Sequence, residues 1–369
     1  MPKAQETVLE INLDHLTHNF NYLKSRINKD TLFLAVVKAF AYGSDAEKIA
    51  LHLQDLDVDY FAVAYTHEGE LLRNFGITKP ILVLHPQPIN FIKIIENCLE
   101  PSLYNAKVLR AFIQTAQNEG QTDYPVHIKF NTGLNRLGFW ENDVDFILDR
   151  LEEQNAVKIK SVFSHLAASE DLNEKDFSQD QIRMFETSSQ KLSDALGYTP
   201  IRHMCNTSGI LNYPEAHFEM VRSGIGLYGF GNSAKENKNL KPIASLKSVI
   251  SQIHKIEEGE TVGYNRAYTA KHFETTATIP IGHADGIGRQ YGNGIGHVFI
   301  NGIKAPIIGN VCMDMIMVNI TGIDCKEGDE VIIFDQSHTA EALAMTTKSI
   351  SYELITAISP RVKRYFIGK

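Results

Sequence analysis

The chain has 369 residues, of which 43% are hydrophobic, and its acidic residues outnumber the basic ones by 44 to 36. This length suits one large domain with a smaller companion, or two domains of similar size. The net charge of -8 argues against the basic surface that binding to a nucleic-acid backbone requires.

The cysteines and the N-terminus indicate where the protein resides. No CxxC pair occurs among the four cysteines, Cys98, Cys205, Cys312 and Cys325. Such spacing is typical of reduced thiols and argues against disulfides and structural zinc, so no metal site is expected. The N-terminal segment lacks the pattern of a signal peptide, and no apolar run approaches the ~20 residues that cross a bilayer. We therefore expect a soluble, cytoplasmic protein without a membrane partner.

The first two-thirds of the chain alternates short apolar runs with longer amphipathic stretches. Strands are predicted at Leu32–Ala39, Tyr60–Ala64, Ile81–Leu84, Pro101–Tyr104, Val126–Asn131, Ile159–His165, Ile201–Asn206 and Met220–Ser223. Helical periodicity lies between them at Ser44–Gln54, Glu68–Phe75, Asn90–Asn97, Ala106–Gln117, Asn142–Gln154 and Asp180–Leu196. Eight βα repeats predict an α/β fold, a TIM-like (β/α)8 barrel over residues 8–238.

The pattern changes after the polar stretch at residues 233–239, which we interpret as a linker. Predicted strands follow at Ala244–His254, Thr275–Pro280, Gly296–Ile300, Ile303–Ile308, Met315–Ile320 and Glu330–Phe334. Turn signals such as Asn301-Gly302 separate them. The sequence therefore predicts a mostly-β C-terminal domain over residues 239–369, closed by a helical and basic tail from Ala340 to Lys369.

A lysine, Lys38, stands at the end of the apolar run at residues 32–37, with Tyr42 and Gly43 directly behind it. Most lysines at strand ends are solvated surface charges. A lysine at the end of a buried strand is partly desolvated, however, which favours the neutral amine and makes it a nucleophile toward aldehydes. The position therefore predicts a lysine that can form a Schiff base.

Further polar side chains lie at the ends of later strands. They are Lys129 and Arg136 near the fifth strand, His165 at the sixth, Asn206 and Thr207 at the seventh, and Arg222 at the eighth. Active sites of such barrels gather at the carboxyl ends of the strands, where the βα loops form the open mouth. Because unpaired buried charge costs several kcal/mol, this collection of cations predicts an anionic ligand.

A glycine-containing turn at residues 222–226 follows the last strand of the barrel. Such a turn lets backbone N–H groups approach a phosphate closely, and the hydroxyl groups of Tyr42 and Thr207 can add donors. An aldehyde-reactive lysine beside a phosphate cradle describes pyridoxal 5′-phosphate (PLP), which we predict as the cofactor.

Seven motifs stand in one order along the chain: AVVKAFAYGSD, KFNTGLNRLGF, FSHLAASE, MVRSGIGLYG, VGYNRAY, GHADGIGR and GNVCMDM. In order and separation they resemble the motifs of alanine racemases, the barrel-type (fold-type III) PLP enzymes, from about residue 8 to the tail. The resemblance implies interconversion of L- and D-alanine, which supplies D-alanine for peptidoglycan of the bacterial cell wall. It also implies a homodimer whose active site is shared between subunits.

The resemblance implies roles for individual residues. Lys38 would carry PLP and act as one catalytic base, and Tyr264 from the second subunit would act as the opposite base. Arg136 would bind the substrate carboxylate, Met313 would lie by the substrate, and Lys129 matches a position that is often carbamylated. The residues that would hold the cofactor are Tyr42, His165, Asn206, Thr207, Arg222, Gly224 and Ile225, with Arg289 and Asp314 in supporting positions.

The chemistry is consistent with these roles. Racemisation removes a proton from one face of Cα and returns one to the other, so two bases on opposite sides suffice. A lysine and a tyrosine can serve if both pKa values fall well below roughly 10. A guanidinium, with a pKa above ~12, keeps its proton, so Arg222 should leave the ring nitrogen opposite it unprotonated. This favours racemisation over the decarboxylation of related barrel enzymes.

Two departures from the family pattern leave alternatives open. His283 stands where a tyrosine usually narrows the substrate entrance, so a broad-specificity amino-acid racemase of the same fold is one alternative. Pro360 stands where many members carry a phosphate-binding tyrosine, so we expect one cofactor contact to be lost or replaced.

A non-catalytic PLP carrier is the second alternative, but such proteins end after the barrel, whereas this chain continues through Tyr264 and Met313.

Overall fold

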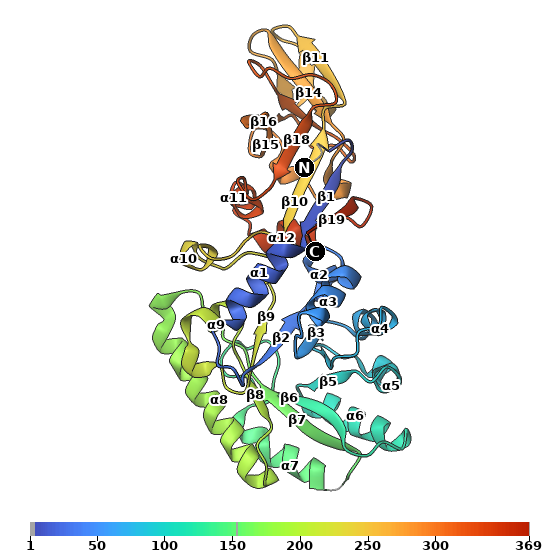
Figure 1. Cartoon of the computed structure of the whole chain (residues 1–369), viewed down its shortest axis with the longest axis vertical. Helices are drawn as coiled ribbons and strands as arrows, with labels where there is room; N and C mark the ends of the chain where they lie inside the picture. Colours follow the sequence, from blue (N-terminus) through green and yellow to red (C-terminus); the bar gives the residue numbers. More distant parts are fainter. Residues whose placement is uncertain (1–3, 153, 369) are drawn as a thin grey trace.

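The structure is a computed structural model that describes residues 4–152 and 154–368. Figure 1 shows an elongated molecule with a barrel at one end and a mostly-β part at the other. The N-terminal end lies within the mostly-β part, beside β18 and β10, and the C-terminal end lies near the junction of the two parts (Figure 1). Within the described residues, no helix is both long and apolar enough to cross a membrane.

Parallel strands build the barrel, in the order β8-β7-β6-β5-β4-β3-β2-β9. Their bounds are β2 Leu32–Val36, β3 Tyr60–Val63, β4 Ile81–Val83, β5 Glu100–Leu103, β6 Tyr124–Lys129, β7 Val157–Phe163, β8 Ile201–His203 and β9 Met220–Ser223. β9 returns to pair with β2, and the N–H of Arg222 donates to the carbonyl of Cys205 after β8 at 3.2 Å. The sheet thus nearly closes on itself, which confirms the predicted TIM-like barrel.

Amphipathic helices surround the barrel: α1 Leu13–Lys24, α3 Ala46–Asp55, α4 Thr66–Asn74, α5 Phe91–Glu96, α6 Ala106–Asn118, α7 Val144–Glu152, α8 Lys175–Leu196 and α9 Thr207–Asn212. In α6 the buried residues Val108, Phe112 and Ala116 recur every fourth position and form one face. Asn105 caps this helix by accepting from the N–H of Val108 at 2.9 Å. Glu153, inside one predicted helix, lies outside the described residues.

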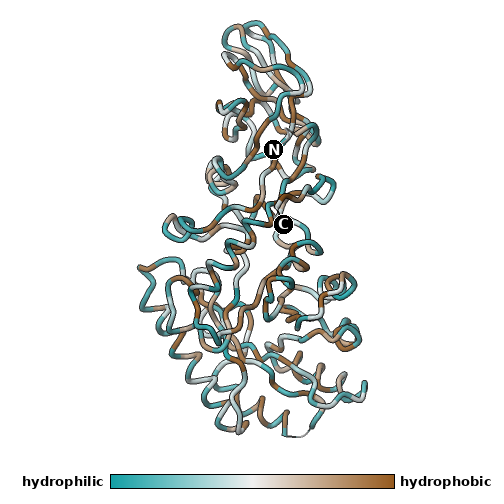
Figure 2. Tube along the Cα trace, in the orientation of Figure 1, coloured by the Kyte–Doolittle hydropathy of each residue, from teal (hydrophilic) through white to brown (hydrophobic). Residues whose placement is uncertain are grey.

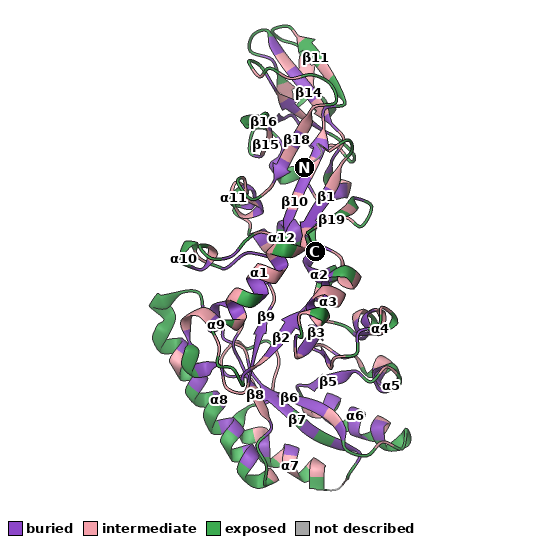
Figure 3. Ribbon diagram, in the orientation of Figure 1, coloured by how far each residue is buried: buried purple, intermediate pink, exposed green. Residues whose placement is uncertain are grey.

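The distribution of burial follows from this arrangement. β3, β4 and β5 are buried at every residue, because helices cover the outer face of a parallel barrel and side chains fill its interior. Figure 3 shows the barrel strands coloured mainly as buried and α8 with exposed residues along it. In Figure 2, α8 alternates between hydrophilic and hydrophobic colours, as expected of a helix with one face on the barrel.

The second sheet is mostly antiparallel, in the order β11-β14-β17-β16-β15-β18-β10-β1-β19. Its strands are β1 Val8–Asn12, β10 Ala244–Val249, β11 Gln252–Ile256, β14 Glu274–Ile279, β15 His297–Ile300, β16 Ile303–Ile308, β17 Ile316–Asn319, β18 Glu330–Phe334 and β19 Lys363–Ile367. The remaining elements are the ribbon β12 Thr261–Val262 and β13 Tyr268–Thr269, and the helices α2 Lys38–Tyr42, α10 Ala234–Asn237, α11 Ala340–Met345 and α12 Ser351–Thr356. Short 3-10 turns occur at η1 Pro88–Asn90, η2 Glu141–Asp143, η3 Leu172–Glu174, η4 Pro214–Ala216, η5 Tyr264–Arg266, η6 His283–Asp285 and η7 Arg289–Tyr291.

Three features differ from the sequence-based expectation. The predicted strand Ala244–His254 is two strands, because Ile250 bonds to Asp329 beside β18 whereas Ser251 bonds to Thr278 in β14. The predicted helical tail contains β19, which pairs in parallel with β1. β1 also pairs with β10, so the second sheet recruits the first strand of the chain. The division at residues 8–238 and 239–369 stays a prediction.

Candidate active site

A cavity of about 590 Å3 opens at the carboxyl ends of the barrel strands. Its polar lining comprises Lys38, Tyr42, His85, Lys129, Arg136, His165, Asn206, Thr207, Arg222, Asn232 and Tyr352, together with Gly224 and Ile225. Ten of these residues were predicted from the sequence, and the structure brings them together. No carboxylate lines the cavity within the described residues, so its lining is cationic and suits an anionic ligand.

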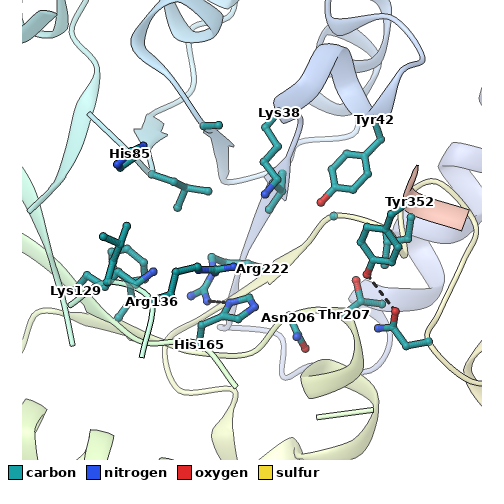
Figure 4. A pocket seen from close by; sticks show the side chains of 18 residues that line it. Lys38, Tyr42, His85, Lys129, Arg136, His165, Asn206, Thr207, Arg222 and Tyr352 are labelled. Carbon is teal, nitrogen blue, oxygen red and sulfur yellow. Dashed lines mark hydrogen bonds between the residues drawn. The ribbon is translucent and has the colours of Figure 1, made fainter. Parts of the chain in front are cut away.

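The side chains divide the cavity into regions. Figure 4 shows Tyr42, Thr207 and Tyr352 on one side and Lys129 and Arg136 on the other. Lys38 and Arg222 lie between these two groups (Figure 4). The cavity therefore has a hydroxyl-rich end and a cationic end, with an amine and a guanidinium in its middle.

An unusual turn places Lys38. Strand β2 ends at Val36, and the four residues from Ala39 to Tyr42 all have φ between 50° and 56°. We call these four residues the left-handed turn. None of them is glycine, and the left-handed conformation costs an L-residue roughly 1–2 kcal/mol. Contacts from elsewhere in the chain must therefore stabilise the turn.

Two side chains hold the left-handed turn. One carboxylate oxygen of Glu68 accepts from the N–H of Ala39 at 2.6 Å, and the other accepts from Ala64 and Tyr65 at 2.7 and 3.0 Å. On the far side, Arg364 donates to the carbonyls of Gly43 and Ser44 at 2.8 and 3.0 Å. Neither Glu68 nor Arg364 was predicted, because nothing in their local sequence indicates what they contact.

Burial lowers the pKa of Lys38, and the positive charge of Arg136 lowers it further, whereas Glu68 acts in the opposite direction. Lowering this pKa increases the share of neutral amine at a given pH. The structure therefore places at Lys38 an amine that can act as a nucleophile or accept a proton.

Lys129 lies at the end of β6, and Arg136 lies on the loop that follows this strand. Lys129 ends β6 and is 7% exposed, and burial, reinforced by the charge of Arg136, lowers the pKa of Lys129 to about 7. Arg136 is exposed on the loop that follows. The carboxamide oxygen of Asn131 accepts from the N–H groups of Gly133 and Asn135 at 3.2 and 3.0 Å, which fixes the path of the loop.

Arg222 is buried and donates four hydrogen bonds. Nη1 donates to Nδ1 of His203 at 2.6 Å, and Nη2 donates to Nδ1 of His165 at 3.2 Å and to the carbonyls of Ser164 and Met204 at 2.8 and 3.2 Å. Burial lowers the pKa of Arg222 to about 10, which leaves it protonated at neutral pH. Burial and the nearby Arg222 hold the pKa of His165 well below its usual range, so its imidazole is neutral.

The hydroxyl-rich end is shaped by glycine. A Cβ on Gly224 would lie 2.2 Å from the phenol oxygen of Tyr42, so any other residue there would displace this phenol. Within the described residues, the N–H groups of Gly224 and Ile225 donate to no acceptor, whereas the N–H of Gly226 donates to Oγ1 of Thr207 at 3.2 Å. Free N–H donors beside hydroxyl groups form a cradle for an anion.

Two residues of this end have contacts that the sequence did not indicate. Asn206 lines the cavity, but its side-chain oxygen accepts from the N–H of Gly209 and caps α9. Tyr352 on α12 was not predicted; its phenol donates to the side-chain oxygen of Asn232 at 3.2 Å beside Tyr42 and Thr207. The cavity therefore has a second phenol despite the proline at position 360. The sequence around Tyr352 is an ordinary helical pattern, so it did not indicate that this tyrosine would line the cavity.

The remaining predicted residues lie elsewhere. Tyr264, Met313 and Asp314 line a separate hollow of about 520 Å3 in the second part of the chain. Tyr264 and Met313 are 73% and 59% exposed, and Asp314 pairs with Arg361 at 2.6 Å. Arg289 is exposed in η7 and lines neither cavity. One copy of the chain thus carries Lys38 and Tyr264 in separate hollows.

The chain is similar to known proteins along its whole length. Two family models match it, the N-terminal domain of alanine racemase at residues 11–231 and the C-terminal domain at residues 243–366. Alanine racemase 2 of Caldanaerobacter subterraneus subsp. tengcongensis is 32% identical over 374 residues, which cover 99% of this chain and 96% of that protein. The chain belongs to the alanine racemase family.

Solved alanine racemase structures share the fold. The alanine racemase of Clostridium difficile 630 superposes with a TM-score of 0.91 and 35% identity, over 100% of this chain and 97% of that one. The alanine racemase of Bartonella henselae, solved with covalently bound pyridoxal phosphate, gives a TM-score of 0.90 and 28% identity, over 99% and 100% of the two chains. PLP is the cofactor of alanine racemases, and the chain is an enzyme of this isomerase class.

The residues of this alanine racemase fit PLP. The cofactor needs an amine for its aldehyde, donors for its phosphate and a partner for its ring nitrogen. Lys38 supplies the amine, Arg222 supplies a buried cation, and the cradle beside Gly224 offers two free N–H groups. Because a Cβ on Gly224 would fill the space next to Tyr42, the cradle depends on the glycine at this position.

Proposed function

We propose that this racemase interconverts L- and D-alanine with two bases, Lys38 of one subunit and Tyr264 of the partner subunit. The observation that carries the proposal is the separation of the two residues. Lys38 lines the cavity of the barrel, whereas Tyr264 is 73% exposed in another hollow of the same chain. An exposed catalytic phenol is best explained by a homodimer in which a second copy brings it to the cavity.

The chain's own groups would hold the cofactor. Lys38 would bind it covalently through Nζ, and Arg222 would face its ring nitrogen beside the neutral imidazole of His165. The phosphate would lie among Tyr42, Thr207, Gly224, Ile225 and Tyr352, near the capping residue Asn206. When bound, PLP supplies an electron sink for the electron pair that is left at Cα when its proton departs.

Each base then has a defined task. Nζ of Lys38, with its lowered pKa, takes or returns a proton on one face of Cα, and the phenol oxygen of Tyr264 of the partner subunit does so on the other. Arg136 would bind the carboxylate of alanine, with Met313 of the partner subunit beside the methyl group. Arg222 keeps its own proton, so the ring nitrogen opposite it would stay unprotonated and PLP would be a weaker electron sink. A weaker sink favours rapid return of a proton to Cα.

The supporting residues act less directly. The pKa of about 7 keeps much of Lys129 as a neutral amine, the form that reacts with carbon dioxide. The resulting carbamate would place a negative charge near Arg136. Asp314 would hold the loop that carries Met313 through its ion pair with Arg361. Arg289, which is exposed in η7, would be a further supporting residue.

The cellular role follows from the family. We infer that the D-alanine supplies peptidoglycan synthesis and that the enzyme works in the cytoplasm. The residue His283 in η6 is exposed and lines neither cavity of one chain, so the alternative of a broader amino-acid range depends on the assembled dimer. The match to both domain models distinguishes the chain from single-barrel PLP carriers.

The proposal is tested by following each enantiomer separately. In deuterium oxide, the purified enzyme should convert L-alanine to α-deuterated D-alanine. Tyr264→Phe should keep the absorbance of bound PLP, lose most racemisation, and become strongly asymmetric in the Cα exchange of the two enantiomers. Tyr365→Phe, which removes an exposed phenol from β19, is the matched control and should behave as the parent does. Parental rates in both directions for Tyr264→Phe would refute the two-base assignment.

A further inference from the structure

A row of buried polar side chains connects five strands of the barrel to the candidate active site. β5 contributes Glu100, β6 contributes His127, β7 contributes Ser161, β8 contributes His203 and β9 contributes Arg222. All five residues are at most 8% exposed. We call this set the buried relay. Barrel interiors are usually filled by branched apolar side chains, so an unbroken polar row is a feature that needs a reason.

Consecutive members of the buried relay are in direct contact. Nε2 of His127 lies 2.6 Å from a carboxylate oxygen of Glu100, and its Nδ1 contacts Oγ of Ser161. The same Oγ lies 2.9 Å from Nε2 of His203. Nδ1 of His203 lies 2.6 Å from Nη1 of Arg222. The contacts therefore run without interruption from a carboxylate to the guanidinium of the cavity.

With a neutral His127 beside an ionised Glu100, the donors and acceptors have one consistent arrangement. A guanidinium can only donate, so Nδ1 of His203 accepts, and the neutral imidazole carries its proton on Nε2. That N–H donates to Ser161, whose hydroxyl is then free to donate to Nδ1 of His127. Nε2 of His127 donates in turn to Glu100. Burial and the charge of Arg222 hold the pKa of His203 well below its usual range, which is consistent with a neutral ring.

The charges at the two ends of the buried relay indicate its role. Within the described residues, Arg222 contacts two imidazoles and two carbonyls but no carboxylate. Glu100, at the opposite end, carries the negative charge, and hydrogen bonds in a chain polarise one another in a low dielectric. The phenol of Tyr60 also faces Glu100, and burial together with this carboxylate raises the pKa of Tyr60.

We propose that Glu100, His127 and Ser161 are positioning residues that hold His203 in the tautomer able to accept from Arg222. If His203 carried its proton on Nδ1 instead, two N–H groups would face each other and Arg222 would be displaced. The buried relay thereby keeps the guanidinium aimed into the cavity. Only the last step, from Arg222 to the ring nitrogen of PLP, rests on the proposed function.

The tautomer can be observed directly. In holoenzyme with nitrogen-15-labelled histidine, long-range proton–nitrogen spectra separate protonated from unprotonated ring nitrogens. We expect His203 to be protonated on Nε2 and unprotonated on Nδ1, with its signals assigned from their loss in His203→Asn. A proton on Nδ1, or on both nitrogens, would overturn the proposal whatever the activity.

Variants separate positioning from packing. Ser161→Ala cuts the buried relay, so His203 should populate both tautomers and kcat should fall about tenfold in both directions, with little change in KM. Ser161→Thr retains the hydroxyl and should restore both. The matched control is Ser102→Ala: Ser102 is buried opposite His127 in the sheet, but its hydroxyl has no partner within the described residues.

The outcomes are distinguishable from one another. Equal losses in Ser102→Ala and Ser161→Ala, with the His203 tautomer unchanged, would mean that the row only packs the barrel. An intact tautomer and intact kcat in Ser161→Ala would also overturn the proposal. Failure of the proposed function itself would appear as absent D-alanine in the parent protein, where the tautomer of His203 is still measurable.

Discussion

The residue with the most informative titration is Lys129, because burial lowers its pKa to about 7 from an ordinary value of 10.5. Between these two values the unfolded chain binds a proton at this site that the folded protein does not. The contribution of Lys129 to the free energy of unfolding is therefore fully present above pH 10.5. It is lost as the pH falls toward 7, because protonation of the buried amine in the folded protein is unfavourable. We expect the free energy of unfolding to rise with pH across this window, by at most about 1.4 kcal/mol per pH unit from Lys129.

The difference between the parent and Lys129→Met measures this contribution. Urea unfolding between pH 7 and 9, in buffer free of carbon dioxide, should give a smaller pH slope in the variant. Lys158→Met, which removes an exposed lysine from β7, should keep the parental slope. Identical slopes in the parent and Lys129→Met would show that Lys129 titrates normally. Added bicarbonate should raise the activity of the parent and leave Lys129→Met unchanged if the carbamate forms.

The element of greatest consequence is the left-handed turn from Ala39 to Tyr42, and Glu68 is its main clamp. Glu68→Gln keeps one acceptor oxygen but replaces the other with an amide donor, so at least one backbone N–H loses its partner. A buried or half-buried unsatisfied N–H costs about 1–3 kcal/mol, so the unfolding midpoint in urea should fall accordingly. Spectrophotometric titration should also show weaker binding of PLP, because Lys38 directly precedes the left-handed turn.

Glu70→Gln on the same helix provides the comparison. Glu70 pairs with the exposed side chains of His67 and Lys93 at 3.3 and 3.6 Å, and ion pairs with such exposed partners contribute little. It should therefore leave both stability and PLP affinity near the parental values. Equal effects from Glu68→Gln and Glu70→Gln would assign the loss to helix α4 in general rather than to the clamp.

Elements whose pattern is local were predictable, and those that depend on distant partners were not. The eight barrel strands stand out because each is a short apolar run, and Lys38 stands out because a charge ends one of them. The left-handed turn consists of residues without glycine, so no local signal marks it. β19 is a basic stretch that becomes a strand only because β1 is available to pair with it. Glu68 and Tyr352 likewise acquire their roles from tertiary contacts alone.

At the scale of the whole molecule, the two proposed bases lie in separate hollows, which predicts complementation. Lys38→Ala and Tyr264→Phe should each abolish most activity. If both variants are unfolded and refolded together, or coexpressed, half of the dimers contain one of each chain. One of the two sites in such a dimer has both bases, so about a quarter of the parental activity should return.

Refolding each variant alone provides the control and should return no activity. A mixture that also stays inactive, although mixed dimers are present by mass spectrometry of differently tagged chains, would mean that each site draws both bases from one subunit. If activity does return, the rate of its return on mixing the two variants in native buffer measures subunit exchange and reports how firmly the subunits hold each other.

The contact of Arg364 with Gly43 and Ser44 has a consequence for how the protein is made. Arg364 follows Ser44 by 320 residues, and it belongs to β19, the strand that pairs with β1. The barrel can leave the ribosome and begin to fold long before this arginine is synthesised. The turn that carries Lys38 therefore lacks one of its two clamps throughout most of translation. The reactive amine therefore gains its complete support only after Arg364 has been synthesised and β19 has paired with β1.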